Sequence, residues 1–66
     1  MNLEQIKYLA EINRCHSLRQ AGEQLHVTAQ ALSQSLTSLE KELNLTLTES
    51  SRTGTFLTSN GHILLD

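Results

Sequence analysis

The segment spanning residues 24–39, QLHVTAQALSQSLTSL, constrains the fold of this chain more than any other part of it. It contains no Asp, Glu, Lys or Arg, and only residues 26–28 separate the apolar pattern of one short helix from the start of the next. Thr28 can cap the free amides of that second helix, and Val27 and Leu32 are spaced as a hydrophobic staple around the cap. A connection of three or four residues between two helices is typical of a helix-turn-helix.

The helix predicted after this turn, residues 29–43, has one apolar side and one polar side. At about 100° per residue its leucines fall within a narrow arc, which we assign to the core. These leucines are Leu32, Leu36, Leu39 and Leu43. The opposite side carries Gln30, Gln34, Thr37 and Lys41, with Ser33 at its margin. Amides and hydroxyls can both donate and accept hydrogen bonds. This side therefore suits the reading of base edges in a DNA groove, and the alternative is an ordinary solvated helix face.

Two further helices are predicted before the turn. Asn2 with Gln5 indicates a capping box and a helix over residues 3–13, and Ser17 begins a second helix over residues 18–25. Gly22 lies within the second helix beside Ala21, where the lack of side-chain bulk would let a neighbouring helix approach closely.

After the third helix the apolar pattern changes to a period of two. Asn44 ends the helix, since it tolerates the left-handed conformation of that position. This pattern predicts a two-stranded hairpin, with strands at residues 45–48 and 56–58 around a polar loop at residues 50–55. Thr58 can cap a last helix from residue 59, which we expect to be cut short. The predicted fold is mainly α, a winged helix-turn-helix in which a three-helix core is followed by a small two-stranded β wing and the start of a fourth helix.

The composition of the chain restricts the classes of function that it can have. Five basic residues against seven acidic ones give a net charge of −2, which disfavours DNA binding because phosphate contacts supply much of its affinity. A single cysteine excludes an internal disulfide, and no Cys/His spacing indicates zinc or another cofactor. No apolar run approaches the roughly 20 residues of a membrane span. We therefore expect a soluble, cytoplasmic protein without a cofactor.

Catalysis is the least favoured class of function. Cys15–His16 and His26 could form a metal site or a nucleophile–base pair, but no acidic residue stands at a matching spacing. A chain of 66 residues also leaves little room for a substrate cleft. We expect no enzymatic activity.

One family matches the whole chain in a single register without gaps. The residues that carry the match are Leu3, Ile6 to Ala10, Ser17, Leu18, Ala21, Leu25, Thr28, Ala31 to Ser33, Leu36, Leu39, Glu40, Leu43, Leu47, Gly54, Leu57, Thr58 and Gly61. In these positions the chain resembles the amino-terminal DNA-binding domain of LysR-type transcriptional regulators. The resemblance implies residues 1–58 as the DNA-binding domain and residues 59–66 as the start of a truncated linker helix.

The resemblance also implies partners and contacts. It implies a homodimer on partly palindromic double-stranded DNA, with the third helix in the major groove and the wing on the backbone or minor groove. A small-molecule effector would bind a further domain that this chain does not contain. The chain departs from the family pattern at Gln34 and Thr53, where relatives often have Arg; Arg52 is the neighbouring substitute.

We take as candidate DNA-binding residues a set from the second helix, the third helix and the wing. They are Arg19, Thr28, Gln30, Ser33, Gln34, Thr37, Arg52 and Thr53. Arg19 is included because the first helix of such a motif crosses the DNA backbone. The rival hypothesis is a winged-helix protein-interaction module that has lost strong DNA binding, which the acidic net charge favours.

Overall fold

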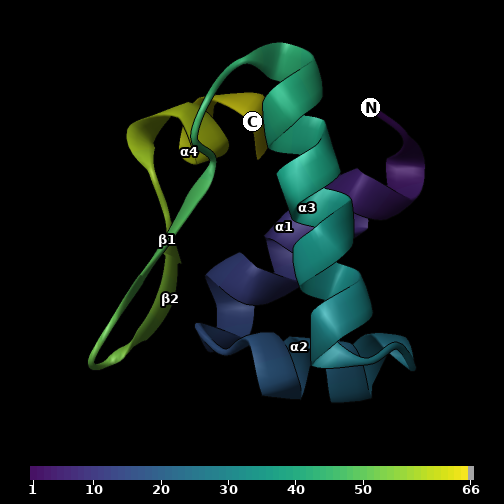
Figure 1. Cartoon of the computed structure of the whole chain (residues 1–66). Coiled ribbons are helices and arrows are strands. Elements are labelled where there is room, and N and C mark those ends of the chain that lie inside the picture. The colour runs from purple at the N-terminus through teal and green to yellow at the C-terminus, as the bar shows by residue number, and fades with distance from the viewer. Residues whose placement is uncertain (66) are drawn as a thin grey trace.

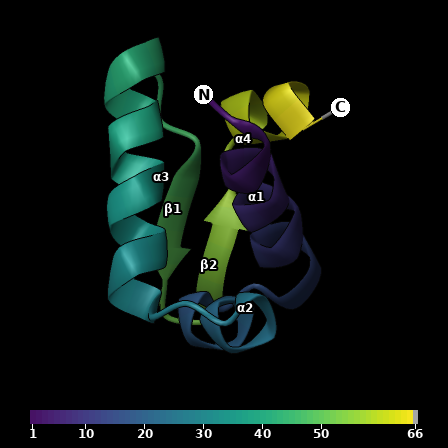
Figure 2. The same ribbon diagram turned by 90° about the vertical axis from the view of Figure 1, so that its right-hand side faces the viewer.

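Four helices and one two-stranded antiparallel sheet make up the computed structural model, which describes residues 1–65 (Figure 1). In chain order they are α1 (Leu3–Cys15), α2 (Leu18–Leu25), α3 (Ala29–Leu43), β1 (Thr48–Ser51), β2 (Gly54–Leu57) and α4 (Ser59–Leu65). In both views α2 lies at one end of the molecule, and α4 lies at the other end with both termini (Figures 1 and 2). The predicted order of three helices, a two-stranded wing and a fourth helix is confirmed.

Polar side chains start the first three helices at the residues that the sequence indicates. Asn2 and Gln5 form both halves of a capping box, with N–H to oxygen distances of 2.9 and 3.1 Å between donor and acceptor atoms. The hydroxyls of Ser17 and Thr28 each accept a hydrogen bond from the backbone amide three residues further on, at 3.1 and 3.0 Å. Each cap satisfies an amide that the helix itself leaves without a partner.

All three of these helices end on a residue in the left-handed conformation. Asn44 has φ 55°, as predicted, but His16 and His26 take the same role with φ 57° and 61°. The predicted end of the first helix at residue 13 is wrong, because α1 continues to Cys15 and the amide of His16 still donates to the carbonyl oxygen of Ile12 at 2.7 Å.

The hairpin is displaced from its predicted position. The first strand is Thr48–Ser51 rather than residues 45–48, and it pairs with β2 so that Thr48 lies opposite Leu57 and Ser51 opposite Gly54. Four of the six residues of the predicted loop are therefore strand, and residues 52 and 53 alone form the turn. Three of the four β1 residues are exposed, so no apolar alternation marks this strand in the sequence.

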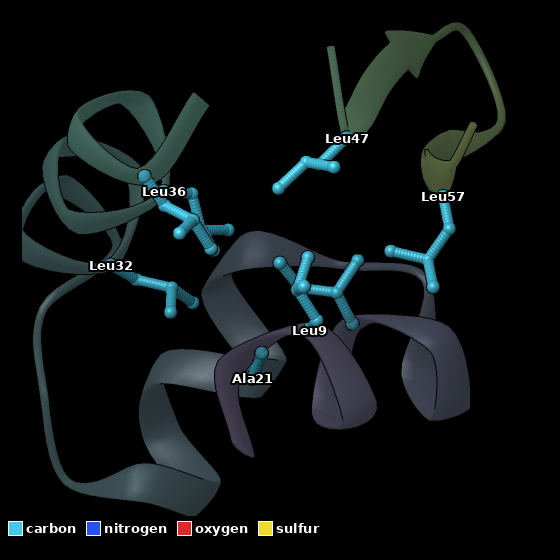
Figure 3. Packing of buried hydrophobic residues seen from close by; sticks show 8 residues of the cluster. Leu9, Ala21, Leu32, Leu36, Leu47 and Leu57 are labelled. Carbon is cyan, nitrogen blue, oxygen red and sulfur yellow. The ribbon is translucent and has the colours of Figure 1, made fainter. Parts of the chain in front are cut away.

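The core is a single cluster between the three helices and the hairpin (Figure 3). Its buried members are Leu9 and Ile12 of α1, Ala21 of α2, Leu32, Leu36 and Leu39 of α3, Leu47 just before β1, and Leu57 of β2. Leu43, which we assigned to the core, is only half-buried and packs against this cluster. Gln5 is buried although it is polar, and its amide nitrogen donates to the carbonyl oxygen of Ser35 at 3.1 Å.

The hairpin is attached to the body of the domain through the connection between α1 and α2. The amide of Thr55 donates to the carbonyl oxygen of His16 at 3.0 Å, and the rings of His16 and Phe56 lie 4.7 Å apart between centroids. Gly54, with φ +145°, has no Cβ where one would strike that same carbonyl oxygen. These contacts fix β2 against the helices, so the wing has a defined position in the fold.

Candidate nucleic-acid interface

The polar side of α3 faces solvent along the whole predicted recognition surface. Figure 2 shows α3 on the outside of the domain, with α1 and the hairpin on its inner side. The side chains of Gln30, Ser33, Gln34 and Thr37 are all exposed, and within residues 1–65 we find no hydrogen bond from any of them. Their amides and hydroxyls therefore keep their donors and acceptors free for an external partner.

A shallow hollow of about 260 Å³ follows this side of the helix. It is lined by Ser33, Gln34, Thr37, Ser38 and Lys41. Four of these residues were expected on this side of the helix, whereas Ser38 was not selected from the sequence. Its position four residues after Gln34, about one helical turn away, is the signal that could have placed it there.

Thr28 stands at the start of α3 and is exposed. Its hydroxyl accepts from the amide of Ala31, so its first role is that of a helix cap. The start of a helix carries amides that have no partner within the helix, together with the positive end of the helix dipole. Such a terminus is suited to a phosphate oxygen.

The candidate cations come from two other segments at the same end of the molecule. Arg19 is exposed in the first turn of α2, and Arg52 with Thr53 forms the exposed turn of the hairpin. In both views the hairpin tip lies at the end where α2 and the start of α3 are found (Figures 1 and 2). Among the described residues neither Arg19 nor Arg52 has an ion-pair partner.

Arg14 differs from these two arginines. Its guanidinium forms an ion pair with Glu11, three residues earlier on α1. The hydrogen bond and the negative charge of Glu11 raise the pKa of Arg14, so this cation is stabilised by a partner within the chain. Arg19 and Arg52 are therefore the freer of the arginines.

Other kinds of site find little support in residues 1–65. We find there no group of three or more His, Cys, Asp or Glu side chains that could hold a metal ion, and no helix with the length and apolar character to cross a membrane. The thiol of Cys15 donates to the carbonyl oxygen of Ser17 at 3.4 Å, and the His16 ring packs against Phe56.

Comparison with known proteins gives one consistent family. The model of the bacterial regulatory helix-turn-helix proteins of the lysR family matches residues 3–62. The nitrogen assimilation regulatory protein nac of Escherichia coli (strain K12) is 42% identical over 64 residues, which cover 97% of this chain and 21% of that protein. The uncharacterized HTH-type transcriptional regulator YcgK of Bacillus subtilis (strain 168) is 38% identical over 66 residues, 100% of this chain and 20% of that protein. The chain thus spans about one fifth of the length of these curated relatives.

Solved structures give the same result for the fold. The CbnR_DBD–DNA complex superimposes with a TM-score of 0.89 at 31% identity, covering 98% of this chain and 75% of the other. The BenM_DBD complex with benA site 1 DNA has a TM-score of 0.89 at 26% identity, with 98% and 73% coverage. The chain belongs to the lysR family of bacterial helix-turn-helix regulators, and its fold is that of the family's winged-helix DNA-binding domain.

Proposed function

We propose that this chain binds duplex DNA as the DNA-binding domain of a transcriptional regulator, with α3 lying in the major groove. The observation that carries the proposal is the outer side of α3, where exposed amides and hydroxyls have no hydrogen-bond partner within the described residues. The side chains of Gln30, Ser33 and Gln34 would contact base edges. Gln can pair in bidentate fashion with adenine, and Ser can donate or accept at several bases.

Contacts to the DNA backbone would come from the edges of this surface. Thr37 would lie at the far margin of the groove, and Thr28 would lie beside a phosphate at the start of α3. Arg19 would contact the backbone from α2, and Arg52 with Thr53 would do so from the wing. That two structures with a TM-score of 0.89 are DNA complexes supports this docking.

The same proposal extends to the whole regulator. Residues 1–58 form the DNA-binding domain, and the helix from residue 59 onward continues as a linker that pairs with a second copy. The dimer binds a partly palindromic site in the cytoplasm, and a small-molecule effector binds a separate domain. Two domains joined in this way bind two half-sites with a gain from effective concentration, which offsets weak binding by one domain.

The number of cations sets the salt dependence that we expect. Among the described residues, the exposed basic side chains on or near the proposed surface are those of Arg19, Lys41 and Arg52. With Z phosphates neutralised the slope of log K against log salt is about −0.9Z, so one domain gives a slope no steeper than about −3.

The test begins with a pool of randomised 30-base-pair duplexes, from which bound sequences are selected. Fluorescence anisotropy then measures the affinity for the selected duplex at two salt concentrations. We expect Gln34→Ala to weaken binding to that duplex by about 1–3 kcal/mol. The matched control is Asn60→Ala, which removes an exposed amide from α4 at the opposite end of the molecule from α2. If the wild-type chain binds no duplex even at low salt, the proposal is wrong and the protein-interaction module is favoured.

A further inference from the structure

One side chain of α3 holds the segment that leads into the wing. The carboxylate oxygen Oε2 of Glu40 accepts a hydrogen bond from the amide of Leu47 at 2.7 Å and another from the amide of Thr48 at 3.2 Å. A carboxylate that accepts from backbone amides makes charge-assisted bonds, roughly twice as strong as neutral ones. Glu40 is half-buried and lies one turn before the end of α3.

These two bonds act on the position and the direction of the wing. Thr48 is the first residue of β1, and within residues 1–65 its bond to Glu40 is the only hydrogen bond that joins α3 to the hairpin. The side chain of Leu47 is fully buried, so the core fixes where the chain leaves the body of the domain (Figure 3). The Glu40 carboxylate then orients the two peptide groups that follow, which sets the direction in which β1 starts.

The wing has a second attachment, and it does not involve α3. It consists of the bond from the Thr55 amide to the His16 carbonyl oxygen and the contact between the His16 and Phe56 rings, both of which hold β2. The tip of the wing, residues 52 and 53, lies beyond both attachments and is exposed. Because Glu40 belongs to α3 itself, it couples the position of this tip to that of the recognition helix.

We propose that Glu40 is a positioning residue: it holds β1 so that Arg52 reaches the DNA backbone while the outer side of α3 faces the bases. This inference rests on the proposed function. Glu40 does not itself contact DNA, since its carboxylate is bound to the backbone amides of Leu47 and Thr48. Its effect on binding acts through Arg52.

The first experiment needs no DNA. Amide hydrogen exchange of Leu47 and Thr48 is measured by NMR in the wild-type chain, Glu40→Ala and Glu40→Gln. We expect exchange of these two amides to become about tenfold faster or more in Glu40→Ala, because the loss of a bond to a charged group frees them. Since a single oxygen accepts both bonds, the carbonyl oxygen of Glu40→Gln can replace it and should restore most of the protection.

Two further variants serve as a control and as a second test of the Glu40 carboxylate. Glu42→Ala is the matched control, because it removes a carboxylate from the same end of α3 that pairs with the amino terminus and not with the hairpin. Glu40→Asp retains the charge but is shorter by one carbon, so it carries the same expectation as Glu40→Ala should the alanine variant fail to fold. Unchanged exchange of Leu47 and Thr48 in a folded Glu40→Ala or Glu40→Asp overturns the inference.

The second experiment is a double-mutant cycle on the selected duplex, measured by anisotropy. We expect Glu40→Ala and Arg52→Ala each to weaken binding by about threefold to tenfold. The double variant should bind the duplex as tightly as the weaker-binding of the two single variants, because Glu40 acts through Arg52 and the two losses therefore do not add. Glu40→Gln should bind nearly as the wild type. Additive losses, or wild-type binding by Glu40→Ala, overturn the positioning role.

The two experiments separate this inference from the proposed function. If the wild-type chain binds no duplex while Glu40→Ala still frees the two amides, the proposed function fails and the positioning role fails with it. If the wild-type chain binds DNA and Glu40→Ala changes neither exchange nor affinity, the proposed function stands and this inference alone is wrong.

Discussion

Substituting Gly22 by Ala tests how closely α2 approaches the turn that precedes α3. In an exposed helix this change stabilises a protein by about 1 kcal/mol, because Ala has the higher helix propensity. Here a Cβ on residue 22 would lie 2.6 Å from the carbonyl oxygen of Val27 and 3.3 Å from the nitrogen of Ala29. Both are backbone atoms, one in the turn and one in the first residue of α3, so neither can move aside as a side chain could.

The size of the effect follows from that distance. Ordinary van der Waals contact starts near 3.4 Å, so the turn must move away from α2 by about 0.8 Å. This movement strains the bond from the Val27 amide to the Gly22 carbonyl oxygen, now 2.9 Å long. Overpacking of this kind costs about 1–3 kcal/mol, and against rigid backbone we expect the upper part of that range. After subtracting the gain in helix propensity, the net loss is about 1–2 kcal/mol.

Urea denaturation followed by circular dichroism measures this loss. A domain of 66 residues has a free energy of unfolding of about 3–10 kcal/mol, so the expected change is a large part of the total. The matched control is Gln24→Ala, on the same helix but exposed, which should change stability by no more than a few tenths of a kcal/mol. An unchanged or higher stability of Gly22→Ala would refute the reasoning, because helix propensity would then outweigh the contact.

Three other substitutions test the core, a helix end and the wing, each by the same denaturation assay. Leu39→Ala removes a fully buried side chain and should cost about 2–5 kcal/mol, so a loss under 1 kcal/mol would contradict its place in the core. His26→Gly relieves a left-handed residue that is exposed, and we expect a gain of about 0.5–1 kcal/mol rather than a loss. Gly54→Ala should lower the free energy of unfolding by about 2 kcal/mol or more, because φ is +145° and the added Cβ would strike the His16 carbonyl oxygen. Retained protection of the Thr55 amide against hydrogen exchange would contradict this, since it would show that the wing stays attached.

The helices were the part of the fold that the sequence predicted best, because their signals are local. The predicted bounds of α2 and α3 match the structure, and each begins at the hydroxyl residue that caps it, Ser17 or Thr28. Asn44 ends α3 in the left-handed conformation for the same local reason. A cap, an apolar stripe and a stop signal lie within a few residues of one another, so they can be read together without knowledge of the fold.

The wing was less predictable because its causes lie elsewhere in the chain. β1 has the sequence TESS, with neither apolar alternation nor high strand propensity. It forms a strand because β2 lies beside it and because Glu40, eight residues before Thr48, holds its first amide. The leucines before it suggested a strand by their spacing, yet Leu45 is 44% exposed whereas Leu47 is fully buried.

The candidate interface likewise has features that the sequence predicts and features that it does not. The angular position of Gln34 and its neighbours on α3 follows from helix geometry alone, and the structure places these side chains on the exposed side. The partners of Gln5 and Glu40 could not be read from the sequence, because they depend on which segments meet in three dimensions. Polar residues near a helix end have many possible partners, and only the packing of the whole domain selects one.

The arrangement of acidic side chains bears on how a chain with a net charge of −2 can present a recognition segment, residues 24–39, that carries no acidic residue. Glu11 is paired with Arg14, and Glu42 with the ammonium group of Met1. Glu40 is turned inward onto two backbone amides. None of the seven acidic residues lies between residues 24 and 39. The outer side of α3 therefore presents hydroxyls, amides and Lys41 to an approaching phosphate, whereas α2 carries the exposed Glu23 as well as Arg19 and the wing carries Glu49 as well as Arg52. The negative charge of the chain thus lies outside the segment that would read the bases.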